Sequence, residues 1–454
     1  MHNSKIRLAI LVGCMALSAN LWAKAQPVQA TLAGHAILPA KSAVSTPKDA
    51  PGDLQQSGKY TSGKRVTELG SVAGKSAERL TGLSLPINGQ PLQGHSGIKH
   101  MPDGTYWVLT DNGFGSKANS PDAMLYLNQY KIDFKDGSVV PLKTLFLHDP
   151  DKKVPFHIIN ESTELRYLTG SDFDPESFQF SDDALWIGDE FGPYLIKTDL
   201  NGKVLAVFDT EVDGKVVKSP DNPTLTLPSA PDGKLNFQVA RSKGFEGMAI
   251  SPDGSKLYPL LEGALWDGEQ FENVDGKRYL RVLEFDTKQQ AWTGRSWQYV
   301  LEDNQNAIGD FNMIDDTHGL VIERDNGEGT ADKACVAGAP TNNCFSQVAR
   351  FKRVYKIAFS DTNVGKPVEK LGYIDLMKIQ DPNKLARKPL NDGVLTFPFF
   401  TIENVDVVDT NHIIVGNDNN FPFSSSRWPN MADDNEFILL DVKDLVSHLA
   451  NSLQ

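Results

Sequence analysis

From about residue 65 onward, the chain alternates short apolar runs with turn sequences and contains no long helical repeat. Residues 106–110 and 185–189 are typical of these runs, and each follows a turn built from Asp, Gly or Ser. Runs of this length that are bounded by Asp-Gly, Asn-Gly or Pro-Asp-Gly sequences are typical of β-strands joined in hairpins. The pattern therefore predicts an all-β protein.

The hairpins recur as a unit. Each unit pairs an apolar strand with a second one that ends in Asp, Glu or Asn near Gly, and the five units span residues 97–113, 174–192, 244–263, 309–327 and 403–420. Repeats of this kind, followed by outer strands, predict a β-propeller. The units lie about 60 to 95 residues apart, more than one ordinary blade needs. We expect six blades, while five or seven also fit if long loops fill the difference.

The spacing within each hairpin predicts where its polar ends lie. Glu246 and Glu262 are each eight residues from Gly254, and antiparallel partners lie at equal distances from their turn. If all inner strands run in one direction around an axis, their open ends share one axial acidic pocket. The residues that would then converge are Glu176, Glu190, Glu246, Glu262, Asn312, Glu323, Glu403, Asn404 and Asn417. The acids in the turns themselves, such as Asp253, are expected to be turn formers.

So many carboxylates in one concavity need a counter-charge, and a divalent cation is the simplest one. The donors are all oxygens, which favours Ca²⁺, with Mg²⁺ or Mn²⁺ as alternatives. We predict metal ligands among Glu176, Glu246, Asn312, Glu403, Asn404 and Asn417, and catalytic roles for Glu190, Glu262, Glu323 and Arg324. Arg241, Arg427 and Asn420 are predicted to bind the substrate.

The first 25 residues have the layout of a signal peptide, with basic residues, an apolar run and Ala-Lys-Ala at 23–25. A lipoprotein signal ending at Cys14 is the alternative. Residues 26–64 are expected to be a disordered or extended lead-in, and residues 65–454 a single propeller domain. We expect a periplasmic or secreted monomer without a membrane span.

The net charge of −13 would become −16 after cleavage, because Lys5, Arg7 and Lys24 would be lost with no acid. An acidic protein of this kind is a poor partner for nucleic acid. Cys335 and Cys344 are predicted to form a disulfide that closes a short loop, since an exported protein meets oxidising conditions. A two-cysteine metal site is the alternative, but it lacks a nearby His.

At these motifs the sequence resembles the phytase-like family, described by an esterase-like activity of phytase. The matching segments lie around Glu176, Glu190, Glu246, Glu323-Arg324 and Glu403-Asn404, within residues 65 to 445. The resemblance implies an exported propeller that hydrolyses phosphate or carboxylic esters. A more distant likeness is to the propeller alkaline phosphatases, whose acid-lined pockets bind metal ions.

The leading hypothesis is a metal-dependent phosphoesterase that acts on a small phosphate ester, with Ca²⁺ activating water and polarising a phosphoryl oxygen. One alternative is a calcium-dependent carboxylesterase or lactonase. The other is a propeller that binds a ligand without catalysis, since fold alone does not imply activity.

Overall fold

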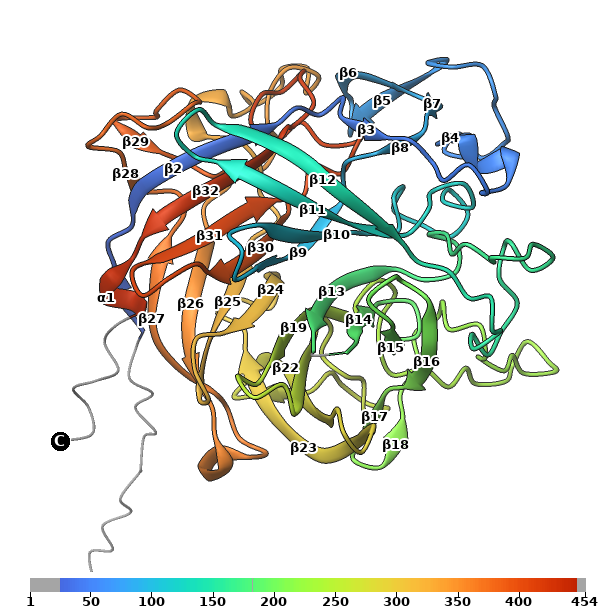
Figure 1. The fold of residues 1–454 in the computed structure, drawn as a ribbon. Helices are drawn as coiled ribbons and strands as arrows, with labels where there is room; N and C mark the ends of the chain where they lie inside the picture. Colours follow the sequence, from blue (N-terminus) through green and yellow to red (C-terminus); the bar gives the residue numbers. More distant parts are fainter. Residues whose placement is uncertain (1–24, 182, 447–454) are drawn as a thin grey trace, which may run out of the picture.

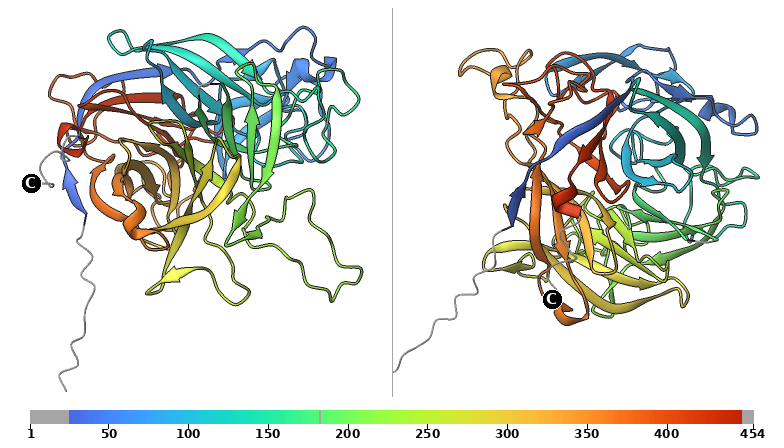
Figure 2. Two further views of the ribbon diagram at one scale, coloured as in Figure 1. Left: turned by 60° about the horizontal axis from the view of Figure 1, so that its bottom comes forward. Right: turned by 60° about the vertical axis from the view of Figure 1, so that its left-hand side comes forward.

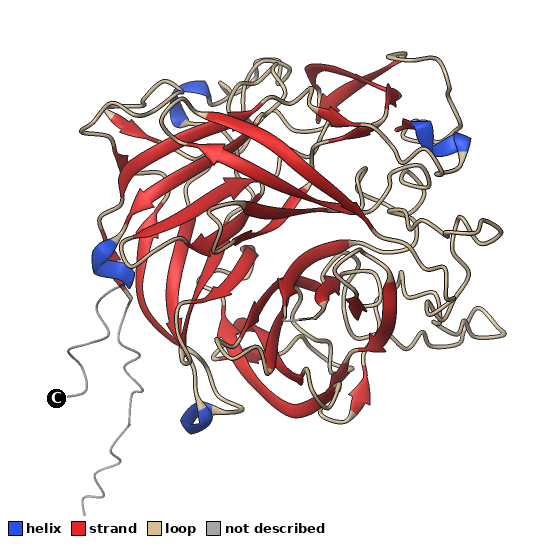
Figure 3. Cartoon of the chain, viewed as in Figure 1, coloured by secondary structure: helices blue, strands red, loops and turns tan. Residues whose placement is uncertain are grey.

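The computed structural model describes residues 25–181 and 183–446. Strands and loops make up almost all of it (Figures 1 and 3), and its helices are α1 (Lys443–Val446) and three short 3₁₀ turns, Gly52–Gln55, Ala331–Lys333 and Asp361–Asn363. None of the helices in this part of the chain has the length and apolar character needed to cross a membrane.

Five antiparallel sheets form the blades of a propeller (Figures 1 and 2). The first contains β9 (His95–His100), β10 (Tyr106–Thr110), β11 (Tyr126–Asp133) and β12 (Ser138–Phe146). The second contains β13 (Pro175–Phe180), β14 (Leu185–Asp189), β15 (Tyr194–Thr198) and β16 (Val204–Asp209). The third contains β19 (Phe245–Ile250), β20 (Lys256–Leu261), β22 (Lys277–Asp286) and β23 (Ala291–Val300), with β21 (Asn273–Val274) beside β22.

The last two blades differ because the N-terminal segment joins them. The fourth contains β24 (Ala307–Met313), β25 (His318–Arg324), β26 (Lys352–Ala358) and β27 (Glu369–Asp375), and β1 (Gln26–Val28) pairs with β27. The fifth contains β30 (Ile402–Val407), β31 (His412–Asn417), β32 (Asn435–Asp441) and β2 (Thr31–Leu38), followed by β28 (Ile379–Gln380) and β29 (Val394–Leu395). The two ends of the domain therefore share a sheet, which closes the ring.

The five inner strands form a closed ring, because each of β9, β13, β19, β24 and β30 contacts the next and β30 contacts β9. Hydrogen bonds join neighbouring inner strands. Ser177 Oγ of β13 donates to the Phe245 carbonyl of β19 at 2.9 Å, and Asn404 Nδ2 of β30 donates to the His95 carbonyl of β9 at 2.6 Å. The ring is tight, since a Cβ on Gly309 would lie 2.2 Å from the Ile402 carbonyl oxygen. The inner strands thus run in one direction around the axis, as the repeated hairpins predict.

The hydrophobic core lies between neighbouring blades. Ile322 and Val354 of the fourth blade pack with Ile402 and Val415 of the fifth, and similar apolar clusters fill the other spaces between blades. Strands that are buried on both faces in this way read as continuous apolar runs. This explains why the sequence of each hairpin is apolar except at its ends.

The blade number and the N-terminal boundary differ from the leading expectations. The structure has five blades, not the expected six, because long loops, not a further blade, occupy the space between units. Residues 26–64 are extended but belong to the folded domain: Leu32 and Ala36 of β2 are fully buried. The predicted signal peptide lies almost wholly outside the described residues.

Short two-stranded sheets occupy the remaining N-terminal region and the segment after the second blade. They pair β3 (Ala43–Val44) with β8 (Gln90–Pro91), β4 (Gln56–Ser57) with β7 (Ile87–Asn88), β5 (Val72–Ser76) with β6 (Arg79–Leu85), and β17 (Glu211–Val212) with β18 (Lys215–Val216). Arg79 donates to Ser425 Oγ at 3.2 Å, so this region packs on the loop after β31. Cys335 and Cys344 are joined by a disulfide.

Candidate metal and catalytic site

A β-bulge interrupts the inner hairpins at the end where they open. In β13, β19 and β30 the register with the next strand shifts around Glu176, Glu246 and Glu403, and shifts also occur in the other two blades. A bulge adds one residue to its strand and redirects a side chain. The charges of these glutamates act on one another, Glu176 on Glu246 and Glu246 on Glu403. The bulges therefore gather three glutamates at one end of the ring.

A second row of polar residues comes from the second strand of each hairpin. The residue that pairs with the inner strand just before its bulge is Thr110, Asp189, Leu261, Glu323 or Asn417. The position that follows it is occupied by Asp111, Glu190, Glu262, Arg324 and Asp418 in the five blades. Because strand side chains alternate between faces, this second position lies on the same face in every hairpin.

At two places the residue on this face differs by one position from the predicted one: Arg324 lies there in place of Glu323, and Asp418 in place of Asn417. Glu323 is fully buried on the other face of β25, where its carboxylate accepts bonds from Tyr299 Oη at 2.9 Å and Lys370 Nζ at 2.7 Å. The side-chain oxygen of Asn417 accepts the Glu436 backbone N–H at 2.7 Å, and its amide nitrogen donates to the Asp434 carbonyl at 3.0 Å. The prediction that these two residues line the site is wrong, and both are structural.

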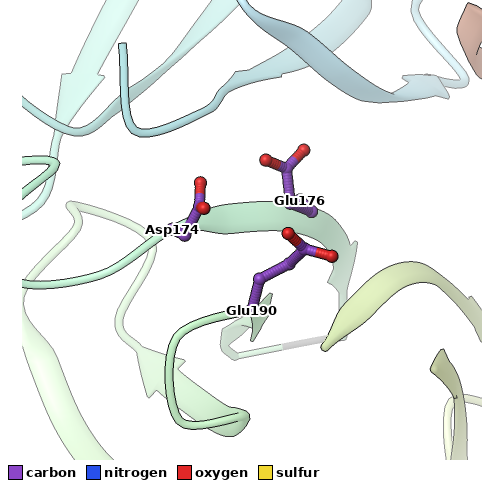
Figure 4. Close-up of side chains that lie close together, drawn as sticks. All are labelled: Asp174, Glu176 and Glu190. Carbon is purple, nitrogen blue, oxygen red and sulfur yellow. The ribbon is translucent and has the colours of Figure 1, made fainter. Parts of the chain in front are cut away.

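Eight carboxylates form the resulting cluster, which we call the acidic mouth: Asp111, Asp174, Glu176, Glu190, Glu246, Glu262, Glu403 and Asp418. Ligand oxygens of Asp174, Glu176 and Glu190 lie within 4.8 Å of one another, and so do those of Glu190, Glu246 and Glu262. Figure 4 shows the first group, in which Asp174 precedes β13, Glu176 belongs to β13 and Glu190 follows β14, and their carboxylates surround one space.

The acidic mouth contains carboxylate oxygens without a partner. Oε1 of Glu190 and Oε1 of Glu246 accept no hydrogen bond from any described residue, although these side chains are only 4% and 6% exposed. Burial and the neighbouring carboxylates raise the pKa of both side chains well above its ordinary value. Burial, then the charge of Asp174, raises the pKa of Asp111 to about 7. Buried charge of this kind needs a cation or a proton.

Two cationic side chains only partly balance the acidic mouth. Arg324 Nη2 lies 3.1 Å from Glu403 Oε1, and Glu403 also accepts a bond from Ser96 Oγ at 3.2 Å. Lys243 forms an ion pair with Glu262 and acts electrostatically on Glu190 and Glu246. These two charges, with Lys117 acting on Asp174, cannot balance eight ionised carboxylates.

Two further predicted ligands lie within the ring of inner strands, where their amide nitrogens join neighbouring blades, and the buried Oδ1 of Asn404 accepts no hydrogen bond from any described residue. Asn312 Oδ1 accepts from Lys99 Nζ at 3.1 Å and Gln179 Nε2 at 2.8 Å, and its amide nitrogen donates to the Val405 carbonyl at 2.8 Å. Asn404 uses its amide nitrogen to join the fifth blade to the first, as described above. The prediction that Asn312 reaches the acidic mouth is wrong, because its amide bridges neighbouring blades.

The predicted substrate-binding residues are dispersed. Arg427 is buried and donates to both Glu436 oxygens at 2.7 and 2.6 Å, so it is structural. Arg241 is 64% exposed and pairs with Asp221, whose charge acts on Asp174, which places it at the rim. Asn420 donates its backbone N–H to Asp418 Oδ1 at 2.7 Å and so lies beside the acidic mouth.

The predicted set omitted Asp111, Asp174 and Asp418. All three lie in the predicted hairpin motifs, so a consistent alternation count in each hairpin would have found them. Lys117 is also absent from it; its Nζ donates to the Asp221 carbonyl at 2.8 Å, and it acts electrostatically on Asp174. No hairpin pattern marks that lysine, because it lies in a loop.

The donor set of the acidic mouth fits a hard divalent cation. Ca²⁺ binds oxygens at about 2.3–2.6 Å, so ligands on opposite sides of one ion lie roughly 4.6–5.2 Å apart. The ligand oxygens of each carboxylate group lie within 4.8 Å of one another, so one ion can contact all three side chains of a group. Asp174, Glu176, Glu190, Glu246 and Glu262 are therefore the residues that would hold the cation.

A cavity of about 840 Å³ lies at the opposite end of the propeller, against the hairpin turns. Its lining includes Lys99, Lys197, Lys288 and Trp186, together with turn residues such as Asp253. Among the described residues, no group of carboxylates that could hold a cation lies in this cavity. We therefore place the candidate chemistry at the bulged ends of the inner strands.

Several solved structures are distantly similar to this chain. The luciferin-regenerating enzyme aligns at 10% identity and a TM-score of 0.32, covering 92% of each chain. The glutaminyl cyclase of Myxococcus xanthus aligns at 10% identity and a TM-score of 0.31, covering 92% of this chain and 99% of the other. The Dos1 propeller aligns at 9% identity and a TM-score of 0.30, covering 79% and 69%.

The sequence comparisons are more informative. An uncharacterized secreted protein of Arthroderma benhamiae is 35% identical over 120 residues, which span 23% of this chain and 22% of that protein. The chain thus matches less than a quarter of the length of this relative. The family model for phytase-like proteins, described as esterase-like activity of phytase, matches residues 90–421. This match contains all five inner strands and the whole acidic mouth, and the chain belongs to the phytase-like family.

Proposed function

We propose that the protein is a metal-dependent phosphoesterase that hydrolyses a small phosphate ester in the acidic mouth. The observation that carries this proposal is the pair of carboxylate groups with unpartnered oxygens on Glu190 and Glu246. A phosphate ester would be repelled by the carboxylates alone, so substrate binding requires a cation between them. When bound, Ca²⁺ would polarise a phosphoryl oxygen and lower the pKa of a water molecule.

The residues around the cation have separate roles in this proposal. Arg324 is the donor for a phosphoryl oxygen, and Glu403 together with Ser96 positions its guanidinium. Lys243 at the rim can approach the substrate anion from the other side. Burial and the charge of Asp174 raise the pKa of Asp111 to about 7, so this side chain can hold a proton near neutral pH. Oδ1 accepts the Gly113 N–H at 2.7 Å, which leaves Oδ2 as the oxygen that carries the proton. The proton on Oδ2 can pass to the leaving group.

An ester panel with and without chelator tests this function. The expected result is hydrolysis of p-nitrophenyl phosphate that EDTA abolishes and added Ca²⁺ restores. Chelator-sensitive hydrolysis confined to p-nitrophenyl acetate or a lactone would replace the phosphoesterase with a carboxylesterase or lactonase. Activity that survives EDTA would overturn the metal role, and absence of hydrolysis on all three substrates would favour a ligand-binding propeller.

We also propose that the protein works outside the cytoplasm. The signal-peptide pattern, the Cys335–Cys344 disulfide and the secreted relative support this location. Fractionation of cells that produce the full chain is expected to find the protein, shortened at its N-terminus, outside the cytoplasm. Full-length protein in the cytoplasmic fraction would contradict the proposal.

A further inference from the structure

The two carboxylate groups of the acidic mouth share one residue. Asp174, Glu176 and Glu190 form the first group, and Glu190, Glu246 and Glu262 form the second. Glu190 directly follows β14 of the second blade, whereas Glu246 and Glu262 belong to the third. Glu190 therefore lies at the junction of two blades and offers oxygens to both groups.

Hydrogen bonding within the protein does not account for the second group. Glu246 is only 6% exposed, and its Oε1 has no hydrogen-bond partner among the described residues. The same holds for Oε1 of Glu190, which is 4% exposed. A buried oxygen without a hydrogen bond destabilises the fold unless a ligand binds it. One ion in the first group would leave Glu246 without a partner, and one ion in the second group would leave the adjacent carboxyl groups of Asp174 and Glu176 without a cation.

We propose that the acidic mouth binds two divalent cations side by side, with the Glu190 carboxylate bridging them. Asp174 and Glu176 complete the first site, and Glu246 and Glu262 complete the second. This inference rests on the proposed function and extends it, because two adjacent cations can clamp both the attacking and the leaving oxygen of a phosphoryl transfer.

The two sites differ in charge. Lys243 and Arg324 both act electrostatically on Glu246 and Glu262, and Lys243 forms an ion pair with Glu262. The first site lies farther from Arg324, whose strongest partners are Glu403, Glu262 and Glu246. A cation entering the second site must displace Lys243 and approach Arg324. The first site therefore binds its ion more tightly than the second.

Calcium titration of the metal-free full chain tests this arrangement. Calorimetry with CaCl₂ is expected to give two ions per chain, with affinities that differ by roughly tenfold or more. Glu176→Gln should remove the tighter ion and Glu246→Gln the weaker one, while Glu190→Gln should remove both. Lys243→Met should tighten the weaker ion more than the other, because Lys243 forms its ion pair with Glu262. Glu269→Gln, on the exposed surface, is the matched control and should bind two ions.

The outcomes separate this inference from the function on which it rests. A single ion in the unsubstituted protein, lost equally in Glu176→Gln and Glu246→Gln, would overturn the bridged pair and leave the phosphoesterase intact. Absence of calcium binding would overturn both. If Glu190→Gln does not fold, as judged by circular dichroism, the single-ion stoichiometry of the other two variants still decides the question.

Discussion

Glu323 and Arg324 are consecutive residues of β25, and their carboxylate and guanidinium groups lie on opposite faces of its sheet. Glu323 Oε2 is 2.7 Å from Lys370 Nζ between the third and fourth blades, whereas Arg324 Nη2 is 3.1 Å from Glu403 Oε1 in the acidic mouth. Two adjacent charged residues thus have unrelated tasks, one structural and one in the candidate site.

Substitutions at these two positions should have different effects. Arg324→Met is expected to lower kcat/KM for a phosphate ester by roughly 100-fold, because a donor to the developing charge is lost. Glu323→Gln should leave kcat/KM nearly unchanged but lower the free energy of unfolding by about 3 kcal/mol, since Lys370 loses its buried partner. Steady-state kinetics and urea denaturation measure the two effects. A large kinetic defect in Glu323→Gln would contradict the register described above.

The same pair shows how far the sequence predicts the site. The mirror spacing of Glu246 and Glu262 about their turn predicts correctly that they share an open end. In the fourth hairpin the register shifts between Ile308 and Phe311. Counting residues from the turn therefore predicts that Glu323 lines the site, whereas Arg324 holds the position that Glu262 has in the third hairpin. A bulge has no sequence signature in these hairpins, and one residue moves a side chain to the opposite face.

The blade count and the origin of the last strand were harder to predict. β2 contains Gly34, His35 and alternating small residues, which gives a weak strand pattern in a segment rich in Ala and Pro. It becomes a strand because it pairs with β32, more than 390 residues later in the chain. Local propensity cannot reveal such a pairing.

Ring closure by β2 can be measured by truncation. Removal of residues 1–38 should lower the free energy of unfolding by at least about 4 kcal/mol relative to removal of residues 1–25, because Leu32 and Leu38 lose their buried contacts. The melting temperatures of the two truncated forms provide the test. Equal melting temperatures would show that β2 does not close the ring.

The buried pair of Arg427 and Glu436 yields a second stability prediction. Arg427→Met leaves the Glu436 carboxylate, which is 1% exposed, without its main partner, and we expect a loss of about 3–5 kcal/mol. The KM of a variant that remains folded should not change. Arg241→Met is the control, since its exposed ion pair should contribute less than about 1 kcal/mol. A raised KM in folded Arg427→Met would show that Arg427 takes part in substrate binding.

The raised pKa values of the acidic mouth predict how stability depends on pH. Asp111 has an ordinary pKa of 3.8 and a folded-state pKa of about 7, so the native chain binds more protons than the unfolded chain between these values. Through Asp111, the metal-free protein is therefore expected to lose stability as the pH rises from about 4 to 7. Added Ca²⁺ should raise the stability more at pH 7 than at pH 4, because it binds the ionised carboxylates of the acidic mouth. Thermal unfolding with and without Ca²⁺ would show the difference; a metal-free protein that gains stability over this range would contradict it.

Anomalous diffraction from crystals grown with Ca²⁺ tests the central claim most directly. The account predicts anomalous density in the acidic mouth, with ligand oxygens of Glu190 and its neighbours at about 2.3–2.6 Å from the ion. Density elsewhere on the protein, or an acidic mouth that holds only water at saturating Ca²⁺, would contradict it.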